Sequence, residues 1–325
     1  MKAAWYEKNG EAREVLTVGE IDTPTPRPGE VLVRLYASGV NPSDVKSRKG
    51  RPLIAPRIVP HSDGAGVVEA AGDGVDKARI GERVWIWNGQ WKRPFGTAAE
   101  YIAVPQQQAV PLPDAIDFAT GACMGIPALT ALHAVTLHGN LKGKTILITG
   151  AAAAVGHYAV QIAKLAGARV IGTSSPERQR LARNGGVDEL IDYRHEDVAE
   201  RVKTLTGAKG VDGIIDMDMS STLPLLARGV LAQHGKMVCY GSNLAGDIPL
   251  SFPAMLWGSL TLQVFVVYEL QQAERQAAIA ELTRLLEAGS LKHAVGATYT
   301  LDDIATGHEA VEGGKVMGNV VLRMA

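Results

Sequence analysis

The sequence has few cysteines, almost no net charge and few aromatic side chains, at 5% of residues. Only Cys123 and Cys239 are cysteines, which excludes a disulfide framework and a four-cysteine zinc module. The 33 basic residues nearly balance the 34 acidic ones, for a net charge of −1, so nothing favours a nucleic-acid or membrane-surface partner. The first eight residues contain no apolar leader-like run, and we expect a reduced, cytoplasmic location.

Long apolar runs without interruption are also missing. Two uncharged stretches, 118–141 and 248–268, are broken by glycine, proline and polar residues. Since a membrane span needs about 20 predominantly apolar residues, we interpret both stretches as buried core.

A length of 325 residues exceeds most single cores and predicts two domains. Residues 1–115 are typical of a small β-barrel, because short strand-like segments alternate with Gly- and Pro-rich turns. The expected strands cover residues 30–37, 64–70, 80–87 and 96–104, and residues 105–113 are the expected hinge.

Residues 116–293 alternate strand and helix patterns, which predicts a doubly wound parallel α/β sheet. The six expected strands cover residues 145–149, 169–172, 189–192, 213–216, 236–240 and 260–267, and residues 273–286 are expected to form an amphipathic helix. The chain then returns to the first domain, which residues 294–325 complete. Because the last strand is strongly apolar and an uncovered edge promotes aggregation, we expect a homodimer that covers it.

The stretch from Thr145 to Thr173 reads strand, small-residue turn, helix and strand, the unit that seats a dinucleotide pyrophosphate on a helix N-terminus. The full G-x-G-x-x-G is absent; Gly150, Ala153 and Gly156 stand in a G-x-x-A-x-x-G pattern. Backbone N–H groups of Ala152, Ala153, Ala154 and Val155 are the candidate phosphate donors. A plain βαβ turn without a cofactor remains the alternative, because alanine disfavours positive φ.

The end of the second strand of this unit predicts which nicotinamide cofactor binds. NAD-specific proteins keep an acid there for the ribose 2′-hydroxyl, whereas this chain has Ser174 and Ser175, with Arg178 close by. Hydroxyl groups and a guanidinium suit a 2′-phosphate, so we expect NADPH. The alternative for Arg178 and Arg180 is a solvated helix face.

Several short motifs, in order and spacing, resemble the medium-chain dehydrogenase/reductase superfamily along the whole chain, and most closely its zinc-free quinone oxidoreductases of the ζ-crystallin type. The matching segments are Gly39–Asp44 (GVNPSD), Asp63–Val68 (DGAGVV), Gly81–Val84 (GERV), Ala98–Tyr101 (AAEY), Gly125–Ala131 (GIPALTA) and Gln161–Lys164 (QIAK). The resemblance implies a GroES-like β-barrel domain and a Rossmann domain, in agreement with the division expected from the residues.

The resemblance also indicates whether the protein is expected to bind zinc. Zinc-dependent members place a cysteine where this chain has Asn41, a histidine where it has Ser62, and a third ligand near Ile126. None of these three side chains is a usual zinc ligand, and we interpret the neighbouring His61 as a barrel-loop residue. Without a Lewis acid to polarise an alcohol, we expect reduction of a quinone or an α,β-unsaturated carbonyl, and no bound metal.

By the same resemblance, Asn41 is a candidate amide donor to the acceptor. Lys46 is a candidate cationic donor, although Lys46, Arg48 and Lys49 form a basic cluster that is typical of an exposed face. Loops 48–57 and 86–95 are expected to line the acceptor pocket. Trp85, Trp87 and Trp91 could stack on a flat acceptor, although packing inside the barrel explains them equally well. The remaining cofactor contacts implied by the resemblance are Thr130, Tyr193, Ser220, Tyr240, Gly241, Ser242, Phe265, Val266 and Asn319.

The sequence thus predicts an NADPH-dependent, zinc-independent reductase of a small-molecule quinone or enone. Two alternatives stay open: a non-catalytic NADPH-binding protein of the crystallin or RNA-associated type, and an alcohol dehydrogenase that binds metal through other ligands.

Overall fold

A computed structural model describes residues 1–324. These residues form two compact units. The first contains 1–127, 283–288 and 293–324, and the second contains 128–282 and 289–292. Each unit has its own sheet and is described by itself.

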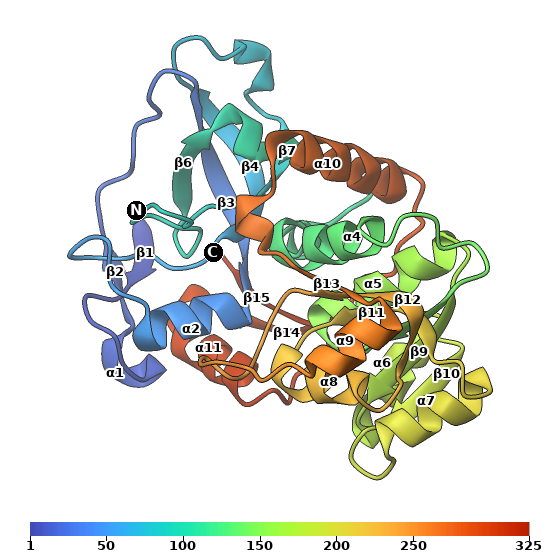
Figure 1. The fold of residues 1–325 in the computed structure, drawn as a ribbon. Helices are drawn as coiled ribbons and strands as arrows, with labels where there is room; N and C mark the ends of the chain where they lie inside the picture. The colour runs from blue at the N-terminus through green and yellow to red at the C-terminus, as the bar shows by residue number, and fades with distance from the viewer. Residues whose placement is uncertain (325) are drawn as a thin grey trace. The chain divides into compact units, whose positions relative to one another are not determined.

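A seven-stranded, largely antiparallel sheet builds the first unit (Figure 1). Its strands lie in the order β14-β15-β3-β4-β5-β7, and β6 also pairs with β3. In the long strand β3, Val31, Val33 and Leu35 alternate toward the buried face, as the two-residue period of a strand requires. The sheet strands are β3 Glu30–Val40, β4 Asp63–Ala71, β5 Arg83–Ile86, β6 Tyr101–Pro105, β7 Ala109–Pro111, β14 Val295–Thr300 and β15 Asn319–Arg323.

A second, two-stranded antiparallel sheet of β1 and β2 and several short helices complete the first unit. Helix α2 begins after Asn41 with Pro42 in its first turn, a position where proline costs no hydrogen bond. The elements are β1 Lys2–Trp5, β2 Thr17–Glu20, α1 Ala12–Val15, α2 Pro42–Gly50, η1 Lys77–Arg79, η2 Gln106–Gln108, α3 Phe118–Gly121, η6 Leu301–Asp303 and α11 Ile304–Glu312. The π-helical segment η3, Met124–Ala128, follows α3 and ends at the boundary between the units.

The second unit is an all-parallel six-stranded sheet in the order β10-β9-β8-β11-β12-β13. This is the order of a doubly wound dinucleotide-binding sheet. One apolar cluster joins the sheet to helices α7 and α8 through residues such as Val202 and Leu223. The strands are β8 Thr145–Ile148, β9 Arg169–Ser174, β10 Glu189–Asp192, β11 Val211–Asp216, β12 Leu231–Cys239 and β13 Thr261–Val264.

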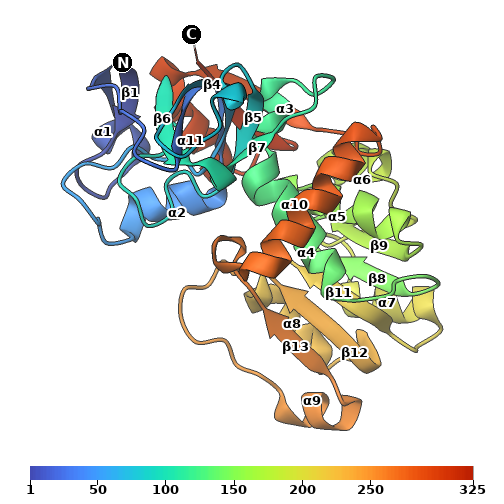
Figure 2. The ribbon, with the colours of Figure 1, turned by 90° about the horizontal axis from the view of Figure 1, so that it is seen from above.

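Helices α4 and α5 pack on each other in the same unit, and Figure 2 shows β13 beside β12 with α9 beyond them. The helices are α4 Leu129–Thr136, α5 Ala154–Leu165, η4 Pro176–Arg178, α6 Gln179–Asn184, α7 Val198–Thr206, α8 Met219–Leu226, α9 Phe252–Gly258, η5 Val267–Glu269 and α10 Gln272–Glu287. The last turn of α10 belongs to the first unit. The predicted six strands and the helix over 273–286 are confirmed.

Three predictions need correction. Residues 105–113 are not a hinge, since β7 pairs with β5 inside the first sheet. The last strand ends at Val264, so Phe265 and Val266 lie beyond it. The run 248–268 is not simply core, because side chains such as Trp257, 80% exposed, and Phe252, 66% exposed, face outward. By contrast, most residues of the run 118–141 are buried, as expected. No helix among residues 1–324 is long and apolar enough to cross a membrane.

Candidate active site

The turn between β8 and α5 has the conformation of a phosphate-binding loop. Gly150 has φ +63° and is the only residue from 150 to 156 with a positive φ, so the alanines of the turn carry no backbone strain. A Cβ on Gly156 would lie 2.0 Å from the carbonyl oxygen of Gly150, which leaves room only for glycine. The degenerate motif therefore keeps glycine at the two positions where the backbone demands it.

Helix α5 starts without a side-chain cap. Its N-cap residue, Ala153, has no side chain that could accept from the first turn, whereas helix starts are usually capped by Ser, Thr, Asp or Asn. The uncapped N–H groups and the helix dipole suit an anion. The Gly150 N–H, by contrast, already donates to the Thr173 hydroxyl, 3.0 Å away. The Ala153 N–H, a predicted phosphate donor, already donates to the Gly150 carbonyl at 2.8 Å.

A cavity of about 480 Å³ lies at this end of the parallel sheet. Six predicted cofactor residues line it: Ala152, Ala153, Ser174, Ser175, Arg178 and Tyr193. Ser174 and Ser175 are nearly buried, while Tyr193 is half exposed. The structure thus brings together the turn, the end of β9 and the residue after β10.

The part of the lining that follows β11 and β12 was not predicted from the sequence. Asp218 accepts hydrogen bonds from the Ser220 hydroxyl at 2.6 Å and from the Asn243 N–H at 2.8 Å. Although partial burial opposes ionisation, these hydrogen bonds hold the pKa of Asp218 below its ordinary value. Asp218, Ser221 and Asn243 line the cavity, and Ser220 does not. These residues could have been predicted from their positions after two neighbouring parallel strands, because ligands bind at the carboxyl ends of such strands.

Asp216, at the end of β11, holds the rim of the sheet together. Its carboxylate accepts from the hydroxyls of Thr149 at 2.8 Å and Thr222 at 2.6 Å. Burial raises the pKa of Asp216, against these hydrogen bonds. The group positions Thr149 and Thr222, which both line the cavity.

A second set of predicted residues lies elsewhere in the same unit. The Thr130 hydroxyl and the Tyr240 hydroxyl are buried, and neither has a hydrogen-bond partner within residues 1–324. The Phe265 ring lies edge-on to His133, with centroids 4.7 Å apart, and 6.4 Å from the Tyr240 ring. Ser242 bonds within its own loop to Leu244, and the Gly241 carbonyl accepts from the Met219 N–H. None of these residues, nor Ala154, Val155 or Val266, lines the 480 Å³ cavity.

In the first unit, Asn41 is buried beside two carboxyl groups. Its side-chain amide donates to Asp63 at 2.9 Å, and its backbone N–H donates to Asp44 at 2.7 Å. Burial raises the pKa of Asp44 to about 7, and burial followed by Asp44 raises that of Asp63 well above its ordinary value. One Asp63 oxygen, Oδ1, is buried with no partner among the described residues. The amide expected to serve an acceptor is therefore already engaged with Asp63.

The predicted basic cluster divides into different environments. Lys46 is exposed on α2, but Arg48 is fully buried and pairs with Glu312, so the expectation of a solvated face is wrong for Arg48. Lys49 also pairs with Glu312, at 2.8 Å. Asn319, the remaining predicted residue of this unit, donates to the Ala294 carbonyl at 3.0 Å.

His61 is a barrel-loop residue, as expected. Its ring contacts the Ser38 hydroxyl at 2.9 Å and the His308 ring nitrogen at 2.9 Å. Burial lowers the pKa of His61 to about 3. Within residues 1–324, no group of three His, Cys, Asp or Glu side chains has the arrangement of a metal site.

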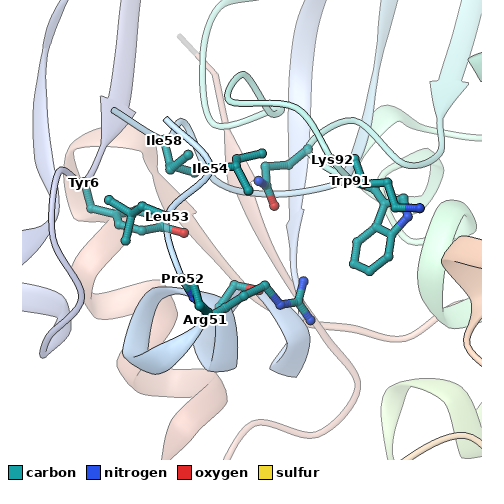
Figure 3. Close-up of a pocket in the computed structure, with 10 residues that line it drawn as sticks. Tyr6, Arg51, Pro52, Leu53, Ile54, Ile58, Trp91 and Lys92 are labelled. Carbon is teal, nitrogen blue, oxygen red and sulfur yellow. The ribbon is translucent and has the colours of Figure 1, made fainter. Parts of the chain in front are cut away.

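The two loops expected to hold the acceptor do meet around a pocket of about 140 Å³ (Figure 3). Its lining is Tyr6, Ser47, Arg51, Pro52, Leu53, Ile54, Ile58, Gln90, Trp91 and Lys92. Of the three tryptophans considered, Trp85 is fully buried in the barrel, and Trp91 is the one that lines the pocket. Lys46 does not line it, although its neighbour Ser47 does.

Comparison with known proteins agrees with both sheets. Residues 27–114 match the alcohol dehydrogenase GroES-like domain, and residues 154–284 match the zinc-binding dehydrogenase family. The chain is 34% identical to a quinone oxidoreductase of Pseudomonas aeruginosa, covering 95% of each protein. It is 31% identical to human quinone oxidoreductase, covering 95% of this chain and 94% of the human protein.

The chain belongs to the quinone oxidoreductase family of the medium-chain dehydrogenase/reductase superfamily. A 2-haloacrylate reductase from a Burkholderia species is also similar, at 32% identity over 99% of this chain and 98% of that protein. Two solved structures match this family member over nearly all of both chains. One is an NAD-dependent alcohol dehydrogenase, with 31% identity and a TM-score of 0.89; the other is a mycobacterial protein complexed with NADPH, with 28% identity and a TM-score of 0.86.

Family membership confirms three sequence-based predictions. This quinone oxidoreductase family member is an oxidoreductase enzyme. Its fold is a GroES-like domain joined to a Rossmann domain, and the resemblance seen in the short motifs is correct.

Proposed function

We propose that this protein is an NADPH-dependent reductase that transfers a hydride to a quinone or an α,β-unsaturated carbonyl compound without help from zinc. The choice of NADPH as cofactor rests on the residues at the end of β9. Ser174, Ser175 and Arg178 line the cavity there, and no acidic residue stands at 173–175. Hydroxyls and a guanidinium complement a 2′-phosphate, whereas an acid would select the 2′-hydroxyl of NAD.

The residues present fit such a cofactor. The uncapped start of α5 offers N–H donors from Ala152, Ala154 and Val155 for a pyrophosphate, whereas the predicted donor Ala153 is already bonded to Gly150. The unpartnered buried hydroxyl of Thr130 is a polar atom that a bound group could satisfy. When bound, the reduced nicotinamide supplies the hydride. We also propose that the cofactor contacts the remaining predicted residues: Tyr193, Ser220, Tyr240, Gly241, Ser242, Phe265, Val266 and Asn319.

The first unit would supply the acceptor chemistry. Its task is to orient an electrophile and to stabilise the negative charge that develops on the acceptor oxygen during reduction. Asn41 and Lys46 remain our candidates for this role. We assign residues 1–115 with 294–325 to acceptor binding and residues 116–293 to NADPH binding.

The decisive experiment measures acceptor-dependent oxidation of NADPH and of NADH by the purified protein, with phenanthrenequinone and with an enone, beside metal analysis of the same sample. We expect turnover with NADPH and with no stoichiometric zinc. Binding of NADPH without turnover of any acceptor would favour a non-catalytic protein. Stoichiometric zinc with alcohol oxidation would favour an alcohol dehydrogenase.

We also propose a homodimer formed at the outer edge of the parallel sheet. Strand β13 lies at one of the two edges of the sheet. Four side chains in or near it are more than half exposed: Val264, Phe252, Leu256 and Trp257. An unpaired apolar edge with neighbouring exposed aromatics favours association. We expect V264K to yield monomers in sedimentation, while L165K, a matched change at an exposed leucine on α5, leaves the dimer intact. A wild-type monomer would refute this proposal.

We propose a cytoplasmic location because of the state of the two cysteines. Cys123 and Cys239 are both buried and unpaired, as in proteins of a reducing compartment. Localising the tagged protein by cell fractionation tests this, and recovery in an oxidising compartment would contradict it.

A further inference from the structure

The lining of the 140 Å³ pocket in the first unit contains two cationic residues, Arg51 and Lys92. Outside the lining, the charge of Arg51 acts against the burial that raises the pKa of Asp44. Arg51 lines this pocket, and among residues 1–324 no Asp or Glu forms an ion pair with its guanidinium. None of the acidic side chains among residues 1–324 lines the pocket. Two nearby arginines in the sequence differ, since Arg48 pairs with Glu312 and Arg57 pairs with Glu7 at 3.1 Å.

Local structure holds the main chain of Arg51 in place. Arg51 is the C-cap of α2, and its N–H donates to the Ser47 carbonyl at 3.1 Å. Its own carbonyl accepts from the Asn9 side chain at 3.1 Å. Pro52 follows and restricts Arg51 to an extended backbone, observed at φ −77° and ψ 133°. The guanidinium therefore projects from a fixed base.

The guanidinium lies over a flat aromatic wall. The central carbon of the Arg51 guanidinium is 5.2 Å from the centroid of the Trp91 ring. In Figure 3, Arg51 extends from the end of α2 toward Trp91, and the Tyr6 ring points toward Leu53. Tyr6 and Ile58 form a buried apolar floor, at 4% and 1% exposure.

We propose that this pocket binds an acceptor carrying a carboxylate on a short, flat, conjugated skeleton, and that Arg51 is the residue that selects the charge. This inference rests on the proposed reductase function and names the class of acceptor. A guanidinium stacked on an indole still presents its N–H edge, which binds a carboxylate through two parallel hydrogen bonds. The floor of Tyr6 and Ile58 can pack against a conjugated skeleton. A cavity near 150 Å³ accommodates a benzene-sized molecule, so a small conjugated acid fits this pocket.

Tyr6 suits the other end of such a molecule. A tyrosine hydroxyl is protonated at neutral pH and can donate to a carbonyl oxygen, and burial, followed by the charge of Asp44, raises the pKa of Tyr6 further, to about 12. The reaction balances as a two-electron reduction. The C=C bond gains a hydride at the carbon β to the carbonyl and a proton from solvent at the α carbon, while one NADPH is oxidised to NADP⁺.

The test compares 4-oxopent-2-enoate, a small enone acid, with its uncharged methyl ester. R51Q is expected to raise KM for the acid about 10-fold, equivalent to about 1.4 kcal/mol, with KM for the ester and kcat for both changed by less than about twofold. R51K should restore part of the affinity, because it keeps the charge but not the bidentate geometry. R57Q is the matched control, since it removes an arginine that stacks on Trp5 at 4.7 Å and does not line the pocket.

A binding measurement gives an independent readout. Calorimetry with 4-oxopentanoate, the saturated acid, on the cofactor-free protein should show binding to wild type and R57Q, and binding to R51Q about 10-fold weaker. Equal effects of R51Q on acid and ester, or on 4-oxopentanoate and its methyl ester, would overturn the inference and leave the reductase activity standing. Arg51-dependent binding of 4-oxopentanoate without turnover of any acceptor would instead refute the reductase activity and retain the anion site.

Discussion

Thr130 offers a substitution with opposite expected effects on folding and on cofactor binding. It lies in the first turn of α4, is 4% exposed, and its hydroxyl has no partner among the described residues. A buried, unsatisfied polar group costs about 1–3 kcal/mol. T130V keeps nearly the same shape and removes the hydroxyl, so we expect the free energy of unfolding of the cofactor-free protein to rise by about 1 kcal/mol.

The matched control is T222V. Thr222 is equally buried, at 2% exposure, but its hydroxyl donates to Asp216 at 2.6 Å. Loss of this bond leaves a buried carboxyl group short of a donor and should destabilise the protein by about 1.5–3 kcal/mol. Urea midpoints of the two variants without cofactor should therefore move in opposite directions from the wild type.

Cofactor binding supplies the second half of the prediction. If the cofactor satisfies the Thr130 hydroxyl, T130V should bind NADPH about 10-fold more weakly in calorimetry, a loss of about 1.4 kcal/mol. A T130V protein destabilised like T222V would show that the hydroxyl is already satisfied in the free protein. A stabilised T130V with unchanged NADPH affinity would remove Thr130 from the cofactor site.

Three further predictions concern charged groups. R178Q should weaken NADPH binding about 10-fold and leave NADH binding unchanged. The control R180Q removes an exposed arginine outside the cavity and should change the affinity for neither cofactor. Equal losses of affinity for both cofactors in R178Q would contradict the 2′-phosphate role. E312Q leaves buried Arg48 without its carboxylate and should lower the free energy of unfolding by about 3 kcal/mol. E309Q, on the same helix, breaks only an exposed pair with Arg13 and should lower it by about 0.5 kcal/mol or less. Similar urea midpoints for the two variants would refute this prediction. The folded-state pKa of Asp44, about 7, lies above its ordinary 3.8, so its stabilising contribution is complete below pH 3.8 and is lost as the pH rises through 7. D44N should accordingly be more stable than wild type at pH 7.5 and lose less stability between pH 4 and 8, and parallel profiles would contradict the assignment.

The two sheets were predictable from the sequence because each leaves a periodic signal. Val31, Val33 and Leu35 alternate as a strand with one buried face requires, and the β8–α5–β9 unit shows its change of period directly. The residues at the end of β9 were also predictable, since Ser174 ends a recognisable strand and Ser175 and Arg178 come soon after it. All three line the cavity. Local pattern suffices where neighbours in sequence are also neighbours in space.

Only the tertiary structure decided which of several similar side chains serve the sites. Arg48, Lys49 and Arg51 look alike in sequence, yet one is buried against Glu312, one pairs with it from the surface, and one faces a pocket. Glu312, the partner of Arg48 and Lys49, lies far along the chain, and in the lining of the 480 Å³ cavity Asp218 bonds to Asn243, 25 residues later. Burial and pairing depend on these long-range contacts, which no local period encodes, so the sequence determined the scaffold and the fold determined the chemistry of each charge.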